Sequence, residues 1–311
     1  MSKTAFVFPG QASQYSGMGL DLYKNFQVAK QTFEEADDVL NFSISKLCFE
    51  GSESDLQLTV NTQPAILVVS VATYRVLFEL GFKPEYVVGH SLGEYSALVA
   101  AESISFVDAV CLVRKRGQYM QEAVAVGKGA MAAVIGSTTQ LVAEICQQSS
   151  NEDSLCVIAN FNSPTQIVIA GHREAVEQAV AEIKARKAGR AILLPVSAPF
   201  HSPLMNPAQE ALKRDLEITT FKDPSISFIS SVDVKLLETG SQVRDSLIRQ
   251  LCAPVRWTEL IQLLIAERVE RFIEVGPKNV LSGLIKQIDK SLSIFNAENS
   301  DSVKTVAGLQ S

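Results

Sequence analysis

Cysteine, histidine and tryptophan are scarce in this sequence of 311 residues, which holds five, three and one of them. The cysteines are odd in number, lie far apart and form no C-x-x-C pair. A disulfide framework therefore has no support, and we expect reduced cysteines packed among apolar residues. They are Cys48, Cys111, Cys146, Cys156 and Cys252.

The sequence also lacks the features of an exported, membrane-bound or nucleic-acid-binding protein. No basic segment followed by an apolar run opens it, and no apolar stretch approaches the roughly 18 residues of a membrane helix. The net charge of −6, from 28 basic and 34 acidic side chains, argues against nucleic acid as a main partner. We therefore expect a cytoplasmic protein that binds neither membranes nor nucleic acid.

Apolar residues in regular patterns are what the sequence has in abundance. Hydrophobic residues make up 47% of the chain and charged residues 20%, which is enough core for one large domain or two smaller ones. Buried strands at 3–8 and 86–88 alternate with helical stretches at 21–41, 61–80 and 92–101. Such alternation indicates a mostly parallel sheet and an α/β fold.

This alternation is interrupted in the middle of the chain. Residues 130–195 follow the order strand, helix, strand, strand, helix, strand, which is the ferredoxin-like pattern. The sequence therefore predicts a large domain made of residues 1–127 and 197–311, with a small ferredoxin-like domain of residues 128–196 inserted in it. The tail after Phe295 is polar, and we expect it to be loosely attached.

The stretch VVGHSLGEYSALVAA, residues 87–101, carries the strongest local chemical signal. Valines precede Gly89 and good helix formers follow Gly93, so the chain has to reverse sharply around Ser91. This is the G-x-S-x-G pattern of a nucleophile elbow, in which the glycines let strand and helix approach closely and the serine hydroxyl is exposed. The backbone N–H of Leu92 can help to hold an oxyanion there. The alternative is that Ser91 merely caps the helix.

Three histidines could activate the Ser91 hydroxyl by taking its proton. His90 is expected to point to the opposite side, and for His172, which opens a helix, a surface or capping role fits. His201 lies in PVSAPFHSPLM, a rigid proline-rich loop of the kind that holds catalytic groups, and we predict it as the base. No acidic residue suggests itself as a third triad member, so a backbone or amide carbonyl could orient the imidazole instead.

Arg116 is the most informative charge. It lies in DAVCLVRKRGQYM on a predicted helix, where it shares an apolar face with Met120. A guanidinium on such a face needs an anion, either a protein carboxylate or a substrate. If it borders Ser91, it can bind a carboxylate on the acyl group, which selects a dicarboxylic acyl unit, and Met120 is predicted to bind substrate with it. This hypothesis requires the hydroxyl, the imidazole and the guanidinium to border one cavity.

Eight ordered segments together resemble the malonyl-CoA:acyl-carrier-protein transacylases of fatty-acid synthesis, and the match runs nearly from end to end. The resemblance implies an α/β-hydrolase-like large domain with an inserted ferredoxin-like small domain, in agreement with the pattern above. The segments are FVFPGQASQYSGMG, TQPAILVVS, GHSLGEYSALVAA, VRKRGQYMQEA, NFNSPTQIVIAG, PVSAPFHSPLM, APVRWTELI and EVGPKNVLSGL.

For the catalytic machinery, the resemblance implies a Ser91–His201 dyad and an oxyanion hole formed by the N–H groups of Gln11 and Leu92. It also implies that a carbonyl of Gln250 orients the histidine, which would explain the missing acid.

For substrate binding, the resemblance implies that Arg116 binds the malonyl carboxylate, that Gln63 is another site glutamine and that Asn162 lies near the coenzyme A groove. Phe200 resembles the form found in malonyl-selecting polyketide acyltransferases. Lys278 stands where the family often has glycine, and we expect it to lie away from the chemistry.

The implied reaction transfers a malonyl group from malonyl-CoA to the phosphopantetheine thiol of acyl carrier protein through a malonyl-serine ester. It has ping-pong kinetics and uses no metal or redox cofactor. A basic cluster, of which Arg190 lies nearest the His201 segment, fits these anionic partners, although a solvated helix face fits it as well. Family members are commonly monomeric, so a monomer is implied. A discrete acyltransferase of a polyketide synthase, and a serine hydrolase such as a thioesterase, stay open as alternatives.

Overall fold

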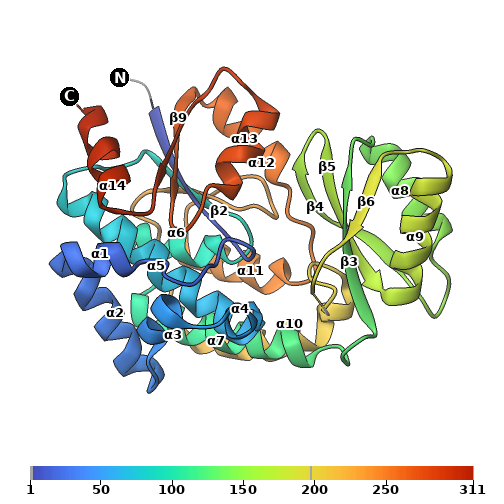
Figure 1. Cartoon of the computed structure of the whole chain (residues 1–311), viewed down its shortest axis with the longest axis horizontal. Helices are drawn as coiled ribbons and strands as arrows, with labels where there is room; N and C mark the ends of the chain where they lie inside the picture. Colours follow the sequence, from blue (N-terminus) through green and yellow to red (C-terminus); the bar gives the residue numbers. More distant parts are fainter. Residues whose placement is uncertain (1–2, 197, 311) are drawn as a thin grey trace.

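A sheet of six strands forms the centre of the larger part of the molecule, within residues 3–196 and 198–310, which the computed structural model describes (Figure 1). Neighbouring strands are parallel except for the last pair at one edge, which is antiparallel. The expected mostly parallel sheet is therefore confirmed. In spatial order the strands are β10 (Ser293–Ala297), β9 (Val269–Val275), β1 (Lys3–Phe8), β2 (Tyr86–Gly89), β7 (Ser227–Ile229) and β8 (Leu236–Leu237).

Helices of very different length surround this sheet. The longest are α5 (Thr59–Glu79) and α7 (Phe106–Glu122), which pack against one another. The others are α1 (Leu20–Asn25), α2 (Gln27–Leu40), α3 (Ile44–Glu50), α4 (Glu53–Gln57), α6 (Gly93–Ala100), α10 (Asn206–Ile218), α11 (Gly240–Gln250), α12 (Trp257–Ala266), α13 (Val280–Ile288) and α14 (Ser300–Ala307), with short 3₁₀ turns at Pro203–Met205 and Gly308–Gln310.

Both faces of the sheet are buried, as the side chains of β1 show. Phe6 and Phe8 belong to the core that includes α5, α6 and α7, whereas Ala5 and Val7 belong to the core that includes α12 and α13. Successive side chains of a strand point to opposite faces, so a strand covered on both sides is apolar throughout. This explains the unbroken apolar run AFVF, residues 5–8, and confirms the α/β class.

A second sheet, on the right in Figure 1, is built from the middle of the chain. Its strands are all antiparallel, and α8 (Thr139–Gln148) and α9 (Arg173–Ala185) contribute to a core of their own with it. The element order is the expected ferredoxin-like one. In spatial order the strands are β4 (Cys156–Ser163), β5 (Gln166–His172), β3 (Gly129–Ile135) and β6 (Arg190–Leu193).

The division into residues 1–127, 128–196 and 197–311 stays a prediction. Its boundary residue Ser197 lies outside the described residues, as do residues 1, 2 and 311.

The chain end is firmly packed, so the expectation of a loosely attached tail after Phe295 is wrong. β10 pairs with β9 as far as Ala297, and α14 buries the side chains of Val303 and Val306 in the main core. Asn299 caps this helix by accepting a hydrogen bond from the Ser302 N–H at 3.0 Å. A short amphipathic helix can dock with only a few apolar side chains. These do not stand out in a segment whose overall composition is polar.

Candidate active site

Ser91 sits at the tip of a sharp turn between β2 and α6. Its φ of 53° lies in the left-handed region, which non-glycine residues rarely adopt. A Cβ on Gly89 would lie 1.9 Å from the Gly93 carbonyl carbon, and one on Gly93 would lie 2.0 Å from the Phe8 oxygen. Only glycine at these two positions lets the strand and the helix come this close, so the turn has the geometry expected of a nucleophile elbow.

His201 faces the Ser91 hydroxyl. Its Nε2 lies 2.8 Å from Ser91 Oγ, and its Nδ1 lies 3.0 Å from the backbone oxygens of both Gln250 and Ala253. Carbonyl oxygens only accept hydrogen bonds, so Nδ1 carries the ring hydrogen and Nε2 presents its lone pair to the hydroxyl. The imidazole is therefore oriented as a general base would be, by two carbonyls rather than by a carboxylate.

The surroundings of His201 keep it neutral. Burial is the main cause that lowers its pKa to about 3, the positive charge of Arg116 lowers it further, and the hydrogen bonds to Gln250 and Ala253 act in the opposite direction. A neutral ring has its Nε2 lone pair free to accept the Ser91 proton at any ordinary pH.

We predict that this burial destabilises the folded protein in acid. The unfolded chain takes up a proton at His201 near pH 6.5 and the folded chain near pH 3, so the free energy of unfolding falls as the pH drops through that window. His201→Gln removes this contribution. Urea unfolding at pH 7 and pH 4.5 should show that the wild type loses about 2 to 3 kcal/mol more than the variant. Equal losses in both proteins would contradict the lowered pKa.

Arg116 lies on the other side of the Ser91 hydroxyl and is fully buried. Its Nη2 donates to Ser91 Oγ at 3.0 Å and to Gln250 Oε1 at 2.9 Å, and its Nη1 donates to Gln63 Oε1 at 2.8 Å. Its Nε has no hydrogen-bond partner, and no carboxylate forms an ion pair with it in the described part of the chain. A buried guanidinium held only by neutral oxygens still lacks the anion that it needs.

A cavity of about 560 Å³ opens in front of the hydroxyl. Among the residues that line it are Ser91, His201, Gln11, Phe200 and Asn162, all of them predicted site residues. The other predicted residues do not line it. They are Leu92, Arg116, Gln63, Met120, Gln250 and Arg190.

The structure thus differs from the expectation that the guanidinium borders the same cavity. The Ser91 hydroxyl and the amides of Gln63 and Gln250 cover Arg116, so it reaches the cavity only through its contact with Ser91 Oγ. Met120 also lies in this buried layer, where its Sδ accepts a hydrogen bond from Gln63 Nε2 at 3.3 Å.

The predicted oxyanion donors are the backbone N–H groups of Gln11 and Leu92. Neither has a backbone or side-chain acceptor within the residues that the structure describes. Gln11 precedes Ala12, whose φ of 81° marks a tight turn after β1. Leu92 follows Ser91 at the start of α6, where the helix dipole favours negative charge.

Two residues, Lys278 and Arg190, lie elsewhere than expected. His90 is among the residues that line the cavity, but its Nε2 is hydrogen-bonded to Asn162 Oδ1 at 2.9 Å and not to Ser91. Lys278 also lines the cavity, so the expectation that it lies away from the chemistry is wrong. Arg190 is exposed at the start of β6, and it is not brought to the cavity.

The sequence interpretation missed Glu94, which is fully buried beside Gln250. Its Oε2 accepts a hydrogen bond from Gln250 Nε2 at 2.5 Å, so it joins the layer that holds Arg116. The available signal was the same as for Arg116, namely a single charge in an otherwise apolar helical stretch.

Neither a metal site nor a membrane span is found in the described part of the chain. It holds no group of three or more His, Cys, Asp or Glu side chains placed to bind a metal ion. None of its helices has the length and apolar character needed to cross a membrane.

A family model, curated relatives and solved structures all match this protein over nearly its whole length. The model of the acyl transferase domain family matches residues 5–310. The malonyl CoA-acyl carrier protein transacylase of Bacillus subtilis (strain 168) is 46% identical over 304 residues, which are 98% of this chain and 96% of that protein. The transacylase structure from Coxiella burnetii superposes with a TM-score of 0.97 at 41% identity, covering 99% of this chain and 97% of that one. A malonyl-transacylase in complex with a type II polyketide synthase acyl-carrier protein gives 0.96 at 44% identity, covering 99% and 100%.

Proposed function

The chain belongs to the acyl transferase domain family, and we propose that it transfers a malonyl group from malonyl-CoA to the phosphopantetheine thiol of an acyl carrier protein. It is an acyltransferase of the kind that serves fatty-acid synthesis. The observation that carries the proposal is the position of Ser91 Oγ, 2.8 Å from a neutral imidazole nitrogen and 3.0 Å from an arginine that lacks an anion.

The first half-reaction forms a malonyl ester on Ser91. As the Ser91 oxygen attacks the thioester carbon, its proton moves to His201 Nε2, and the N–H groups of Gln11 and Leu92 stabilise the oxyanion of the tetrahedral intermediate. The carbon–sulfur bond then breaks, and the coenzyme A thiolate takes the proton from His201. Arg116 also disfavours the imidazolium, so His201 returns this proton readily.

The second half-reaction runs the same steps in reverse with a different thiol. The phosphopantetheine thiol gives its proton to His201 and attacks the Ser91 ester, and the serine oxygen leaves with that proton. Both thiol carriers use one site in turn, so the kinetics are ping-pong. The malonyl carboxylate on Ser91 pairs with Arg116 by replacing one of the neutral amide oxygens, from Gln63 or Gln250, that the guanidinium contacts, which accounts for the choice of a dicarboxylic acyl group.

Radiolabelled malonyl-CoA tests this function directly. We expect a stable labelled protein in the absence of carrier, and transfer of the label to holo acyl carrier protein when that is added. The matched control is apo carrier protein, which lacks the phosphopantetheine thiol and should accept no label. Rapid release of free malonate without carrier would instead indicate a serine hydrolase.

A polyketide carrier is the second candidate acceptor. It is favoured by the 44% identity to a malonyl-transacylase that was solved with a polyketide acyl-carrier protein. The labelled protein offered to carriers of both pathways distinguishes them by the rate of transfer.

A cytoplasmic location is part of the same proposal. Its support is that all five cysteines are free, as expected of a reducing compartment.

A further inference from the structure

The side chain of Gln250 lies between Glu94 and Arg116, and all three side chains are fully buried. Its Nε2 donates to Glu94 Oε2 at 2.5 Å and to the Ser91 backbone oxygen at 3.0 Å. Its Oε1 accepts from Arg116 Nη2 at 2.9 Å. The amide is therefore a bridge between a buried carboxyl group and the guanidinium beside Ser91.

Glu94 decides which way round this amide is held. A carboxylate only accepts hydrogen bonds, so the Gln250 amide presents its NH₂ group to Glu94 and, as a result, its oxygen to Arg116. The opposite orientation would set a carbonyl oxygen against the carboxylate and an NH₂ group against the guanidinium. Both contacts are repulsive, and because they are buried they would destabilise the folded protein.

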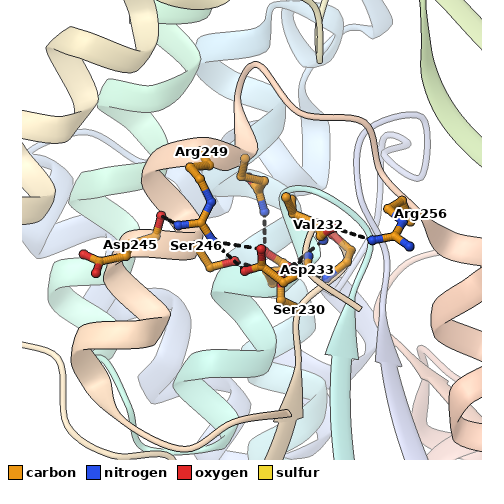
Figure 2. A network of polar contacts seen from close by, with 10 residues as sticks. Ser230, Val232, Asp233, Asp245, Ser246, Arg249 and Arg256 are labelled. Atoms are coloured by element: carbon orange, nitrogen blue, oxygen red, sulfur yellow. Dashed lines mark hydrogen bonds and ion pairs between the residues drawn. The ribbon is translucent and has the colours of Figure 1, made fainter. Parts of the chain in front are cut away.

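Glu94 is itself held by the loop that follows β7. The Ser231 N–H donates to Glu94 Oε1 at 2.5 Å. Figure 2 shows how this loop is tied to α11: the carboxylate of Asp233 is paired with Arg249 at 2.7 Å, and Ser230 Oγ lies 2.7 Å from Ser246 Oγ. Since α11 ends at Gln250, the loop that holds the carboxyl group is tied to the helix that carries the amide.

Glu94 also places a negative charge near Arg116 without forming an ion pair with it, since the Gln250 amide lies between the two groups. Burial lowers the pKa of the Arg116 guanidinium, and the charge of Glu94 acts in the opposite direction. Burial also raises the pKa of the neighbouring Tyr95 to about 12, so that phenol is neutral. Burial raises the pKa of Glu94 to about 7, against the hydrogen bonds from Ser231 and Gln250 and the charge of Arg116, which lower it. Above that pH the carboxyl group is ionised, and its acceptor-only role is enforced.

From this arrangement we propose that Glu94 is a positioning residue for acyl-group selection. By fixing the Gln250 amide with its oxygen on Arg116, it holds the guanidinium beside Ser91, where the carboxylate of a dicarboxylic acyl group on Ser91 can pair with it. Glu94 does not line the cavity, so it acts through Gln250 and not by touching substrate. The inference rests on the proposed malonyl transfer.

The test is Glu94→Gln, which keeps the shape and removes the charge, assayed at pH 8 with malonyl-CoA and acetyl-CoA. The new amide has one acceptor oxygen for two donors, so its NH₂ group is set against either the Ser231 N–H or the Gln250 NH₂ group. We expect kcat/KM for malonyl transfer to fall about 10- to 100-fold, the effect of one lost hydrogen bond to a charged group. Acetyl transfer should stay within about threefold of the wild type, since an acetyl group has no carboxylate for the guanidinium to bind. Equal losses for both acyl groups, or no loss, would overturn the proposal.

Two comparisons make the result specific. Glu274→Gln is the matched control, because Glu274 is an equally buried carboxyl group, with a pKa also raised to about 7 by burial, that accepts from the Leu281 and Ser282 N–H groups. It should leave the malonyl-to-acetyl ratio unchanged. In a Gln250→Ala background, Glu94→Gln should change that ratio no further, since the bridge is already gone. A full additional loss there would contradict action through Gln250.

Failures of folding and of function remain distinguishable. If Glu94→Gln does not fold, Glu94→Asp replaces it, because aspartate keeps the charge but is too short to meet Ser231 and Gln250 together. The malonyl-to-acetyl ratio should again fall, and an unchanged ratio would count against the proposal. If the wild type itself transfers no malonyl group, the proposed function has failed rather than the role of Glu94.

Discussion

Ser91→Ala is expected to lower kcat for malonyl transfer by about 10⁴-fold or more and to leave no acyl group on the protein. The reason is geometric. The Ser91 oxygen is 2.8 Å from His201 Nε2 and 3.0 Å from Arg116 Nη2, so it can lose its proton to one group while the other stabilises the negative charge. Mass spectrometry after incubation with malonyl-CoA measures the ester directly.

Ser96→Ala is the matched control for this variant. Ser96 lies on α6 one turn beyond the elbow, is fully buried, and its hydroxyl has no hydrogen-bond partner within the described residues. Its loss should leave labelling intact. A malonyl ester on Ser91→Ala, or wild-type label mapped to a peptide without Ser91, would remove the basis of the proposed mechanism.

The fold was predictable where apolar residues repeat with a clear period. KTAFVF predicts a strand buried on both faces, and the ferredoxin-like order follows from its alternating apolar segments. The helical stretch at 21–41, in contrast, is divided at Phe26, where the backbone is extended with φ −131° and ψ 124°. Neither glycine nor proline marks that break, so nothing local predicts it. The docked chain end was missed because its burial depends on distant partners.

The site was predictable where its chemistry is local. The glycines around Ser91 and the prolines around His201 identify the two residues without knowledge of their contact. The role proposed for Glu94 depends on its contact with Gln250, which is 156 residues away in the chain. Lys278 likewise lines the cavity because its loop folds back on the turn after β1, where its Nζ donates to the Ala12 oxygen at 3.3 Å. Contacts between residues so far apart in the sequence cannot be predicted from the local spacing of residue types.

Arg116→Ala is expected to abolish the preference for malonyl over acetyl groups. A buried site built to pair with a polar group rejects analogues without it, so we expect kcat/KM for malonyl-CoA to fall by about 10³- to 10⁴-fold. Acetyl-CoA has no carboxylate to pair with the guanidinium and loses only the contact of Arg116 with the Ser91 oxygen, so it should be affected far less. Lys115→Ala is the control from the same helix, because its exposed ion pair with Asp215 contributes little to any site. Measuring kcat/KM for malonyl-CoA and acetyl-CoA with the wild type, Arg116→Ala and Lys115→Ala gives the malonyl-to-acetyl ratio of each protein.

The same substitution should also make His201 more basic. The positive charge of Arg116 is one cause of the lowered His201 pKa, so its removal raises that pKa and moves the acid limb of acetyl transfer to higher pH. In the wild type we expect a bound malonyl carboxylate to have the same effect, since it would offset the guanidinium charge. The correct acyl group would then strengthen the base that activates Ser91, and Arg116 would couple selection to chemistry. An acid limb at the same pH in wild type and Arg116→Ala would contradict the effect of Arg116 on His201, and equal losses of malonyl and acetyl transfer would contradict its role in selection.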